Sequence, residues 1–455
     1  MNSNYKQELD LKESLAIIVG RIIGSGIFKT PAPIMLLSGS VIIFLGTWIV
    51  GGILTILSAT LYAEMVAAFP KSGGPYEYLK RAYHPIVSFL RGWAMFFVSE
   101  TASIVIVSIV FSEYTLKILM ILFSIETNFF IEMLLTISLI WVFSILNCFG
   151  LKFSGWLQNL LSLLKIFALF YIFILCFSHD PKNIFQYEDF SQISLATFLT
   201  GVGSSLRYAF FAYSGWEGAT YVAEEVKNPS KNLPLSLFLG ISIVIFLYLL
   251  TNIAYLTQLT PQEIANSKFV AADAIEKALG GIAALVISII IVINTSSNVN
   301  AQIFTKSRTW HAMARDGLFF SFLKNLDKNG LPIASLIFQS FWATILTLLA
   351  YSSYFLKSTV SIYDRLIDFF SFTSALFNIL TIIAVVILRK KYPNVPRPFK
   401  VPFLYAIFLV VLSIYGFYSF YTLYTAFYES ILGILLTLTG LIYWYFFINK
   451  KTIKD

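Results

Sequence analysis

The sequence predicts an all-helical protein that crosses a membrane twelve times, and three observations point to this fold class. Of the 455 residues, 58% are hydrophobic and only 12% are charged, and the mean hydropathy is +0.78. Soluble chains carry about 25% charged residues, so much of this protein's surface must meet lipid. The second observation is a series of long apolar runs. The third is an uneven distribution of lysine and arginine between the connecting segments.

The apolar runs are the expected transmembrane spans, because about 20 apolar residues are needed to cross the hydrocarbon core. In chain order the spans are 14–38, 40–68, 86–112, 129–149, 153–178, 195–224, 234–258, 279–305, 332–351, 362–388, 401–424 and 428–448. The segments between them are short and polar, and none is long enough to form a soluble domain.

Lysine and arginine predict the orientation of the spans. With the N-terminus in the cytoplasm, 22 of the 32 lie in inward-facing segments, six lie in outward-facing loops and four lie within spans. Cytoplasmic segments carry an excess of these residues, so the tails 1–13 and 449–455 are both predicted to be cytoplasmic. The same distribution explains the basic pI of about 9.1 without a nucleic-acid partner.

Two spans contain helix-breaking sequence near the middle of the membrane. The first span has Gly24-Ser25-Gly26 at its centre, and the sixth has Ser214-Gly215 at a comparable depth. Glycine costs about 1 kcal/mol in a helix interior, and unpaired backbone groups in lipid cost more. A lone glycine pair in a span commonly serves close helix packing. Two interruptions five spans apart instead predict inverted repeats that meet at a central substrate site.

The chemistry of two such breaks suits a zwitterion. A helix that ends inside the membrane leaves carbonyl oxygens without partners, and the half-helix beyond the break offers N–H groups and a positive dipole end. The half-helix that begins near Ile27 would bind a carboxylate, and the carbonyls near Ile23 and Phe211 would bind an ammonium group. The predicted ligand is therefore a free α-amino acid.

Five ordered motifs, which extend over nearly the whole chain, carry a resemblance to a known family. They are GRIIGSGIFKTP (20–31), FPKSGGPYEYLKRAY (69–83), FAYSGWEGATYVAEEVKNPSKNLP (211–234), SSNVNAQIFTKSRTWHAMARDG (296–317) and LIDFFSFTSALFNILTIIAVVILRKKYPNVPRPFKVP (366–402). The sequence resembles the amino acid–polyamine–organocation superfamily, and within it the L-type amino acid transporter group. This implies the leucine-transporter fold, in which the inverted repeats would be 14–178 and 195–392, with the last two spans (400–448) outside them.

The resemblance also implies a set of binding residues. They are Gly24, Ser25 and Gly26 for the substrate carboxylate, the carbonyls of Ile22, Phe211 and Ser214 for its amino group, the aromatic side chain of Phe211 as a gate with Trp216 in the same segment, and Asn300 near the substrate side chain. Arg21 and Glu217 depart from the pattern of the family, and both would alter the preference for the substrate side chain.

Lys165 is the most informative charge within a span. A lysine at the membrane midplane costs at least about 2.5–3.5 kcal/mol and therefore needs a partner or a cavity. Several sodium-independent members of the family carry a lysine in the fifth span, where sodium-coupled relatives bind the ion. We therefore expect Lys165 to replace the cation and to link the two broken helices, and the alternative is a structurally paired lysine.

Four other charges lie in or beside the spans. Glu100 and Glu217 are candidate proton carriers, although a hydrogen-bonded structural carboxylate is the interpretation favoured for each. Arg21 is expected to pair with an acid at the inner gate, and Arg207 receives no role.

These observations predict a secondary transporter of neutral amino acids that works by alternating access without sodium, through exchange or proton-linked uptake. The alternative within the same fold is an exchanger of cationic amino acids or polyamines, which Glu217 would favour. A channel and an intramembrane enzyme are the alternatives outside the transporter class. The sequence contains no metal-ligand cluster, nucleotide-binding loop or nucleophile motif, so we expect no cofactor, no metal and no enzymatic activity.

The cysteines and the outer loops carry two further expectations. Cys148 and Cys176 are predicted to be free, buried thiols, and residues 113–128 contain no cysteine that could hold a disulfide-linked subunit. The outer loops contain no N-glycosylation sequon, which favours a bacterial inner membrane.

Overall fold

The computed structural model is helical over the residues that it describes, which are 7, 9–124, 128–149, 151–186, 193–328, 330–355 and 361–448, with the side chains of 151–163 and 353–355 excepted. The helices are α1 (Leu11–Ile22), α2 (Gly26–Lys29), α3 (Pro31–Ser38), α4 (Val41–Ala68), α5 (Pro75–Ala82), α6 (Pro85–Ala94), η1 (Met95–Ser99), α7 (Glu100–Phe123), α8 (Phe129–Cys148), α9 (Leu151–Ser178), α10 (Leu195–Ala212), η3 (Trp216–Glu225), α11 (Pro229–Gln258), α12 (Pro261–Asn266), α13 (Val270–Leu279), α14 (Gly281–Arg315), η4 (Ser321–Lys324), α15 (Ile333–Phe355), α16 (Ile362–Lys391), α17 (Leu404–Thr425), α18 (Phe427–Tyr443) and η5 (Trp444–Ile448). The predicted tail 449–455 lies outside the described residues.

Nine segments of the described chain are long and apolar enough to cross a membrane. They coincide with the second to fourth and the seventh to twelfth predicted spans. The first and sixth spans are absent from this set because each is divided into shorter helices, and the fifth contributes only the shorter apolar helix Leu164–Ser178. The protein is therefore an all-helical, polytopic membrane protein.

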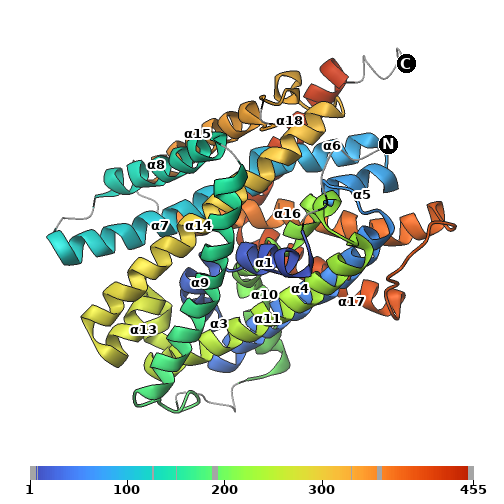
Figure 1. Cartoon of the computed structure of the whole chain (residues 1–455). Coiled ribbons are helices and arrows are strands. Elements are labelled where there is room, and N and C mark those ends of the chain that lie inside the picture. Colours follow the sequence, from blue (N-terminus) through green and yellow to red (C-terminus); the bar gives the residue numbers. More distant parts are fainter. Residues whose placement is uncertain are drawn as a thin grey trace.

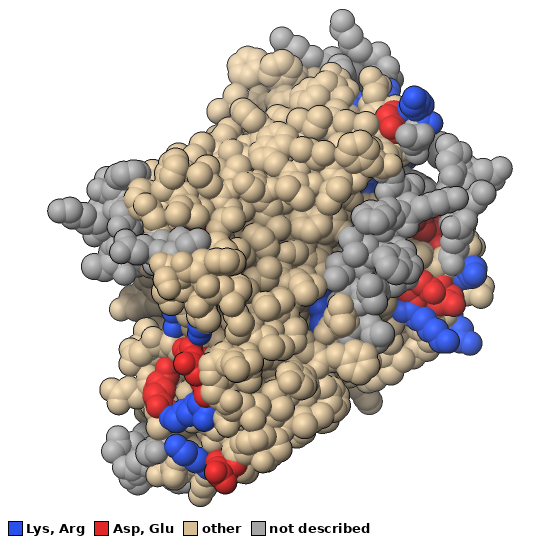
Figure 2. Space-filling view, turned by 60° about the vertical axis from the view of Figure 1, so that its left-hand side comes forward, with Lys and Arg blue, Asp and Glu red and all other residues tan. Residues whose placement is uncertain are grey.

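The surface agrees with a membrane environment. Figure 2 shows a broad band with few charged side chains between two regions where Lys, Arg, Asp and Glu gather. Large apolar side chains are exposed on the helices, including Phe167, Leu349 and Phe420. A soluble monomer rarely leaves so much contiguous apolar surface uncovered, so lipid is the expected neighbour of these residues.

The first broken span lies at the centre of the molecule, where α1 contacts α9, α11, α14 and η3 (Figure 1). A capping box starts α1, because the Asp10 side chain accepts from the backbone N–H of Glu13 while the Glu13 side chain accepts from that of Asp10. The helix ends at Ile22, and three non-helical residues separate it from α2.

The sixth predicted span is divided in the same way. α10 ends at Ala212, and Gly215 adopts a left-handed conformation with φ of 95°. Glycine reaches this conformation without steric cost, so the chain can turn here and continue as the 3-10 helix η3. The two broken spans are also joined at one end, because the backbone N–H of Leu9 donates to Glu225 O (3.0 Å) and that of Lys227 donates to Leu9 O (2.7 Å).

Candidate substrate site

The two helix breaks touch each other. A Cβ atom on Gly26 would lie 2.5 Å from the Cα of Ala212, and one on Gly215 would lie 3.1 Å from the carbonyl oxygen of Arg21. Carbon atoms in contact are normally about 3.5–4.0 Å apart, so the first position has no room for a side chain. The glycines therefore allow the backbones of α2 and α10 to approach closely.

The first break exposes backbone donors, as the sequence predicts. Within the described residues, no hydrogen bond is made by the backbone N–H groups of residues 24–27, and the first amide beyond them with an acceptor is Phe28, which donates to Ser25 O (3.2 Å). Free N–H groups at the start of a helical segment attract an anion. The short helix α2 continues through Thr30 into α3, so these donors head a longer helical segment.

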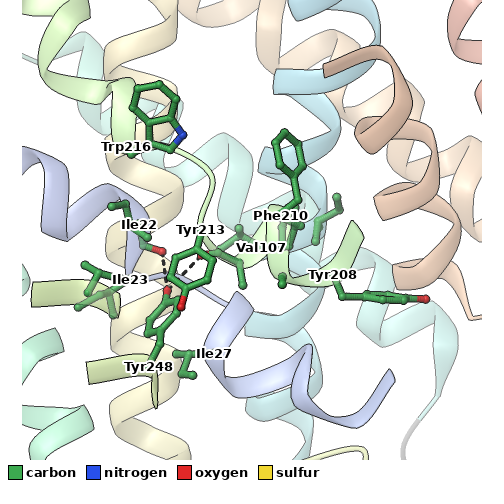
Figure 3. Packing of buried hydrophobic residues seen from close by; sticks show 14 of the residues in the cluster. Ile22, Ile23, Ile27, Val107, Tyr208, Phe210, Tyr213, Trp216 and Tyr248 are labelled. Carbon is green, nitrogen blue, oxygen red and sulfur yellow. Dashed lines mark hydrogen bonds between the residues drawn. The ribbon is translucent and has the colours of Figure 1, made fainter. Parts of the chain in front are cut away.

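Carbonyl oxygens at both breaks are held by one tyrosine. The Tyr248 hydroxyl on α11 lies 2.9 Å from Ile22 O and 3.2 Å from Ala212 O, and Figure 3 shows its bond to Ile22. The carbonyl oxygen of Phe211 accepts from the backbone N–H and the hydroxyl of Ser214. A carbonyl has two lone pairs, so the Ile22 oxygen keeps one for a ligand ammonium group, whereas both lone pairs of the Phe211 oxygen are already used by Ser214.

A cavity of about 40 Å³ lies between the breaks and the neighbouring helices α6, α7, α14 and α16. Its walls include eight of the residues predicted from the sequence: Ile22, Gly24, Ser25, Gly26, Phe211, Ser214, Trp216 and Glu217. The tertiary structure thus brings the residues of the two breaks, which lie almost 200 positions apart in the chain, to one cavity.

Two of the predicted residues do not line this cavity. Asn300 accepts a hydrogen bond from Asn147 on α8 (2.8 Å), whereas Asn298 and Gln302 on the same helix face the cavity. Side chains four residues apart share a helix face, and the side chain between them points elsewhere. Lys165 lies behind the first break, fully buried, and its ammonium group donates to Gly20 O (2.7 Å).

A buried ion pair that the sequence reading missed lies on the other side of the cavity. Lys306 on α14 pairs with Glu100 on α7, and its ammonium group also donates to Gln302 (2.8 Å). Gln302 donates to Asn298 (2.7 Å), which donates to the carbonyl oxygen of Arg21 (3.0 Å). This chain of polar groups reaches from α7 to the end of α1.

The helix that carries Glu100 is distorted immediately before it. A short π-helix, η1, precedes Glu100, and the Thr101 hydroxyl donates to the Phe96 carbonyl five residues earlier (2.7 Å). Single-turn π-helices inside α-helices are frequent at functional sites because they change the direction of the following side chains. Here Glu100 faces Lys306 and the cavity.

The two arginines of the broken spans have different environments. Arg207 pairs with Asp368 on α16 (2.7 Å) and thereby joins α10 to α16. Arg21 does not make the ion pair with an acid that we expected, because no carboxylate of the described residues lies within 4.0 Å of it. Its guanidinium lies over the Tyr221 ring, 5.4 Å from the centroid.

A second group of ion pairs joins α2, α7 and α13 at the end of the molecule opposite Leu9. Lys29 pairs with Glu113 on α7 (2.7 Å), and Lys268 approaches the same carboxylate (3.4 Å). Lys117 pairs with Asp273 on α13 (3.1 Å). The half-helix beyond the first break is thus anchored to α7, as the half before the break is anchored to η3.

The fold and this cavity define a class, a polytopic membrane protein with a small internal binding site between two broken helices. A family model described as amino acid permease matches residues 9–448. The chain belongs to this amino acid permease family, part of the amino acid–polyamine–organocation superfamily, and is an amino acid transporter. The sequence-based recognition of the family is confirmed.

Similar proteins agree with the family. The chain is 36% identical over 419 residues to the large neutral amino acids transporter small subunit 2 of Mus musculus, which covers 88% of this chain and 74% of that protein. It is 32% identical over 418 residues to the Asc-type amino acid transporter 1 of Mus musculus, covering 90% and 76%. It is 28% identical over 454 residues to the b(0,+)-type amino acid transporter 1 of Homo sapiens, covering 99% and 89%.

Proposed function

We propose that the protein exchanges neutral amino acids across a cell membrane by alternating access, without sodium. The observation that supports this most directly is the contact between the two breaks, where free N–H groups at residues 24–27 lie beside the carbonyl of Ile22, which keeps a free lone pair. One group suits the carboxylate of an amino acid and the other suits its ammonium group. The alternative to exchange is uptake linked to protons, and the transport assay described below distinguishes the two.

The charges around the cavity favour a neutral substrate over a cationic one. Three cationic and two acidic side chains line it, and these are Arg21, Arg91, Lys306, Glu100 and Glu217. A cationic substrate side chain would add to an excess of positive charge, which is costly in a low-dielectric interior. The excess therefore outweighs Glu217, the residue on which the alternative of a cationic amino acid or polyamine exchanger rests.

The small volume of the cavity supports alternating access. A water molecule needs about 10–15 Å³ of cavity volume. The cavity of about 40 Å³ therefore holds about three water molecules and no complete amino acid. Substrate must enter when the helices separate on one side. The contacts of Lys29 with Glu113 and of Leu9 with Glu225 lie at opposite ends of the broken spans, and each would open in one state.

We extend the proposal to topology and location. The protein would have twelve spans in the leucine-transporter fold, with repeats 14–178 and 195–392, the last two spans at 400–448 and both termini in the cytoplasm. The divided first and sixth spans support this arrangement. The proposed location is a bacterial inner membrane. The proposal includes neither a disulfide-linked subunit nor an enzymatic step.

Counterflow in proteoliposomes tests the proposal. Vesicles that contain the purified full-length protein are loaded with one unlabelled amino acid at a time, and the entry of the labelled form is measured. We expect saturable entry that depends on the internal amino acid and continues when sodium is replaced by choline. Stimulation by a pH gradient would identify proton-linked uptake. Best counterflow with arginine or agmatine would contradict the neutral substrate, and unsaturable entry would indicate a channel.

Lys165 is proposed to take the place of a coupling cation, as its bond to Gly20 O at the end of α1 supports. A buried ammonium group beside the last carbonyls of a helix stabilises that helix end. We expect Lys165→Ala to lower the counterflow rate at least ~10-fold, because a hydrogen bond to a charged group contributes about 1.5–3 kcal/mol. Rates are measured with and without sodium.

The control for this prediction is Lys182→Ala, which removes an exposed lysine outside the cavity and should leave the rate unchanged. Full-rate uptake and exchange by Lys165→Ala would show that the ammonium group has no part in coupling.

A further inference from the structure

Two buried arginines face the cavity without partners. Among the described residues, Nε and Nη1 of Arg21 and Nε of Arg91 are buried and make no hydrogen bond. Arg21 is 6% exposed and Arg91 is 2% exposed, and both line the same cavity. A buried polar donor without a partner destabilises the folded protein, and more so when it is charged. These donors are therefore free to bind a ligand in the cavity.

The net charge of the side chains around the cavity also favours an anionic ligand. Glu100 and Lys306 neutralise each other in their ion pair. This leaves Arg21 and Arg91 against Glu217, and no carboxylate oxygen of the described residues lies within 4.0 Å of either guanidinium. A buried cation without a counter-charge is strongly destabilising, so the missing group is an anion.

The surroundings of both guanidinium groups hold them toward the cavity. Arg21 lies over the Tyr221 ring, and Arg91 lies over the Phe377 ring with 5.6 Å to the centroid. A Cβ atom on Gly218 would lie 2.6 Å from Cδ of Arg21, so this glycine makes room for the arginine side chain. Guanidinium groups held in place bind a planar carboxylate through paired N–H donors.

The two arginines lie on one side of the central site. Arg21 is in the last turn of α1 before the break, and Arg91 is in α6, ahead of the π-helix that leads to Glu100. Each arginine lies between the N-terminal end of its span and the depth of the free N–H groups at residues 24–27. With cytoplasmic termini, this is the cytoplasmic side.

We propose that Arg21 and Arg91 form a second carboxylate-binding subsite between the central site and the cytoplasm, an inference that rests on the proposed function. Two ligands of the same chemistry would supply this carboxylate. It is the α-carboxylate of an amino acid that enters or leaves on the cytoplasmic side, or it is the distal carboxylate of an acidic substrate in the central site. In either case the subsite raises affinity at the cytoplasmic face.

The test compares the two membrane faces in vesicles that contain the full-length protein. Everted vesicles expose the cytoplasmic face and right-side-out vesicles expose the outer face, and the probe is the labelled neutral amino acid with the fastest counterflow in the panel above. We expect Arg91→Met to raise KM at least ~10-fold at the cytoplasmic face and less than about twofold at the outer face. Arg21→Met should behave alike, and Arg91→Lys should keep part of the affinity.

The matched control is Arg81→Met on α5, which removes an arginine that pairs with Glu77 (2.7 Å) outside the cavity and should change KM at neither face. The subsite is overturned if Arg91→Met changes neither the KM of the neutral probe nor the competition by L-glutamate described below, or if it changes KM equally at both faces. The absence of counterflow in the wild type instead overturns the proposed function.

Two competitors of similar shape distinguish the sources of the carboxylate. L-Glutamate and L-glutamine compete equally at the cytoplasmic face if the α-carboxylate binds. If the distal carboxylate binds, L-glutamate competes better than L-glutamine, and it loses this advantage in Arg91→Met. A readout that needs neither transport nor a variant is the melting temperature of the purified protein, which sodium propionate should raise and propionamide should not. Equal effects of the two compounds would overturn the subsite.

Discussion

Gly26→Ala is expected to abolish most of the transport activity. The new methyl carbon would lie 2.5 Å from the Cα of Ala212 and 2.7 Å from its Cβ, about 1 Å inside normal contact. Because one of these atoms belongs to the backbone of α10, no rotation of a side chain relieves the overlap. Overpacking of this kind costs about 1–3 kcal/mol, and the two breaks must move apart. Counterflow should fall at least ~10-fold, and the melting temperature should fall with it.

Gly416→Ala is the matched control for this prediction. Gly416 lies within α17, and a Cβ atom there would meet no atom within 4 Å. Alanine is favoured over glycine in a helix by about 1 kcal/mol, so this variant should be at least as stable as the wild type and equally active. If Gly26→Ala matched it in both measurements, the close approach of the two breaks would not be needed for transport.

Separate neutralisation of Glu100 and Lys306 should strongly destabilise the protein. Lys306→Met would leave the Glu100 carboxylate buried without its counter-ion, and Glu100→Gln would leave the ammonium group in the same position. Breaking one partner of a buried pair costs about 3–5 kcal/mol. The double variant removes both charges and should recover part of that loss. Thermal unfolding of the four proteins gives the coupling energy as a double-mutant cycle.

The contrast is an exposed ion pair in the same protein. Lys277 lies 2.6 Å from Glu263 between α13 and α12, and its hydrogen bonds lower the pKa of Glu263 to about 2. Both side chains are at least one-third exposed, so Lys277→Met should cost less than about 1 kcal/mol. Equal losses from Lys277→Met and Lys306→Met would show that burial does not strengthen the Glu100 pair.

The site was only partly predictable from the sequence. Hydropathy placed the end of the eighth span at residue 305, whereas α14 continues to Arg315 with Lys306 buried inside it. A lysine looks like the end of a span unless its partner is known, and Glu100 lies about 200 residues away. The four-residue spacing of Asn298, Gln302 and Lys306 was a signal that the sequence already contained, because such positions share a helix face.

The motifs of the family located the two helix breaks, which are properties of the backbone. The breaks at residues 23–25 and 213–215 occur where the motifs indicate. The direction of a side chain such as that of Asn300 depends instead on how α14 is rotated against α7 and α8. A link between the two breaks is made by Tyr248, which no local pattern distinguishes from the other tyrosines of the seventh span.

The sequence by itself determined that this chain lies in a membrane and where two of its helices break. Both properties are local, since hydropathy acts over about 20 residues and glycine acts on its own backbone dihedrals. The tertiary structure alone decided which charges are neutralised and which remain without partners. The energy of a buried charge depends on the groups that the fold brings within a few ångströms of it. Lys306 has Glu100 as such a partner, whereas buried N–H groups of Arg21 and Arg91 make no hydrogen bond within the described residues and are proposed to bind an anion.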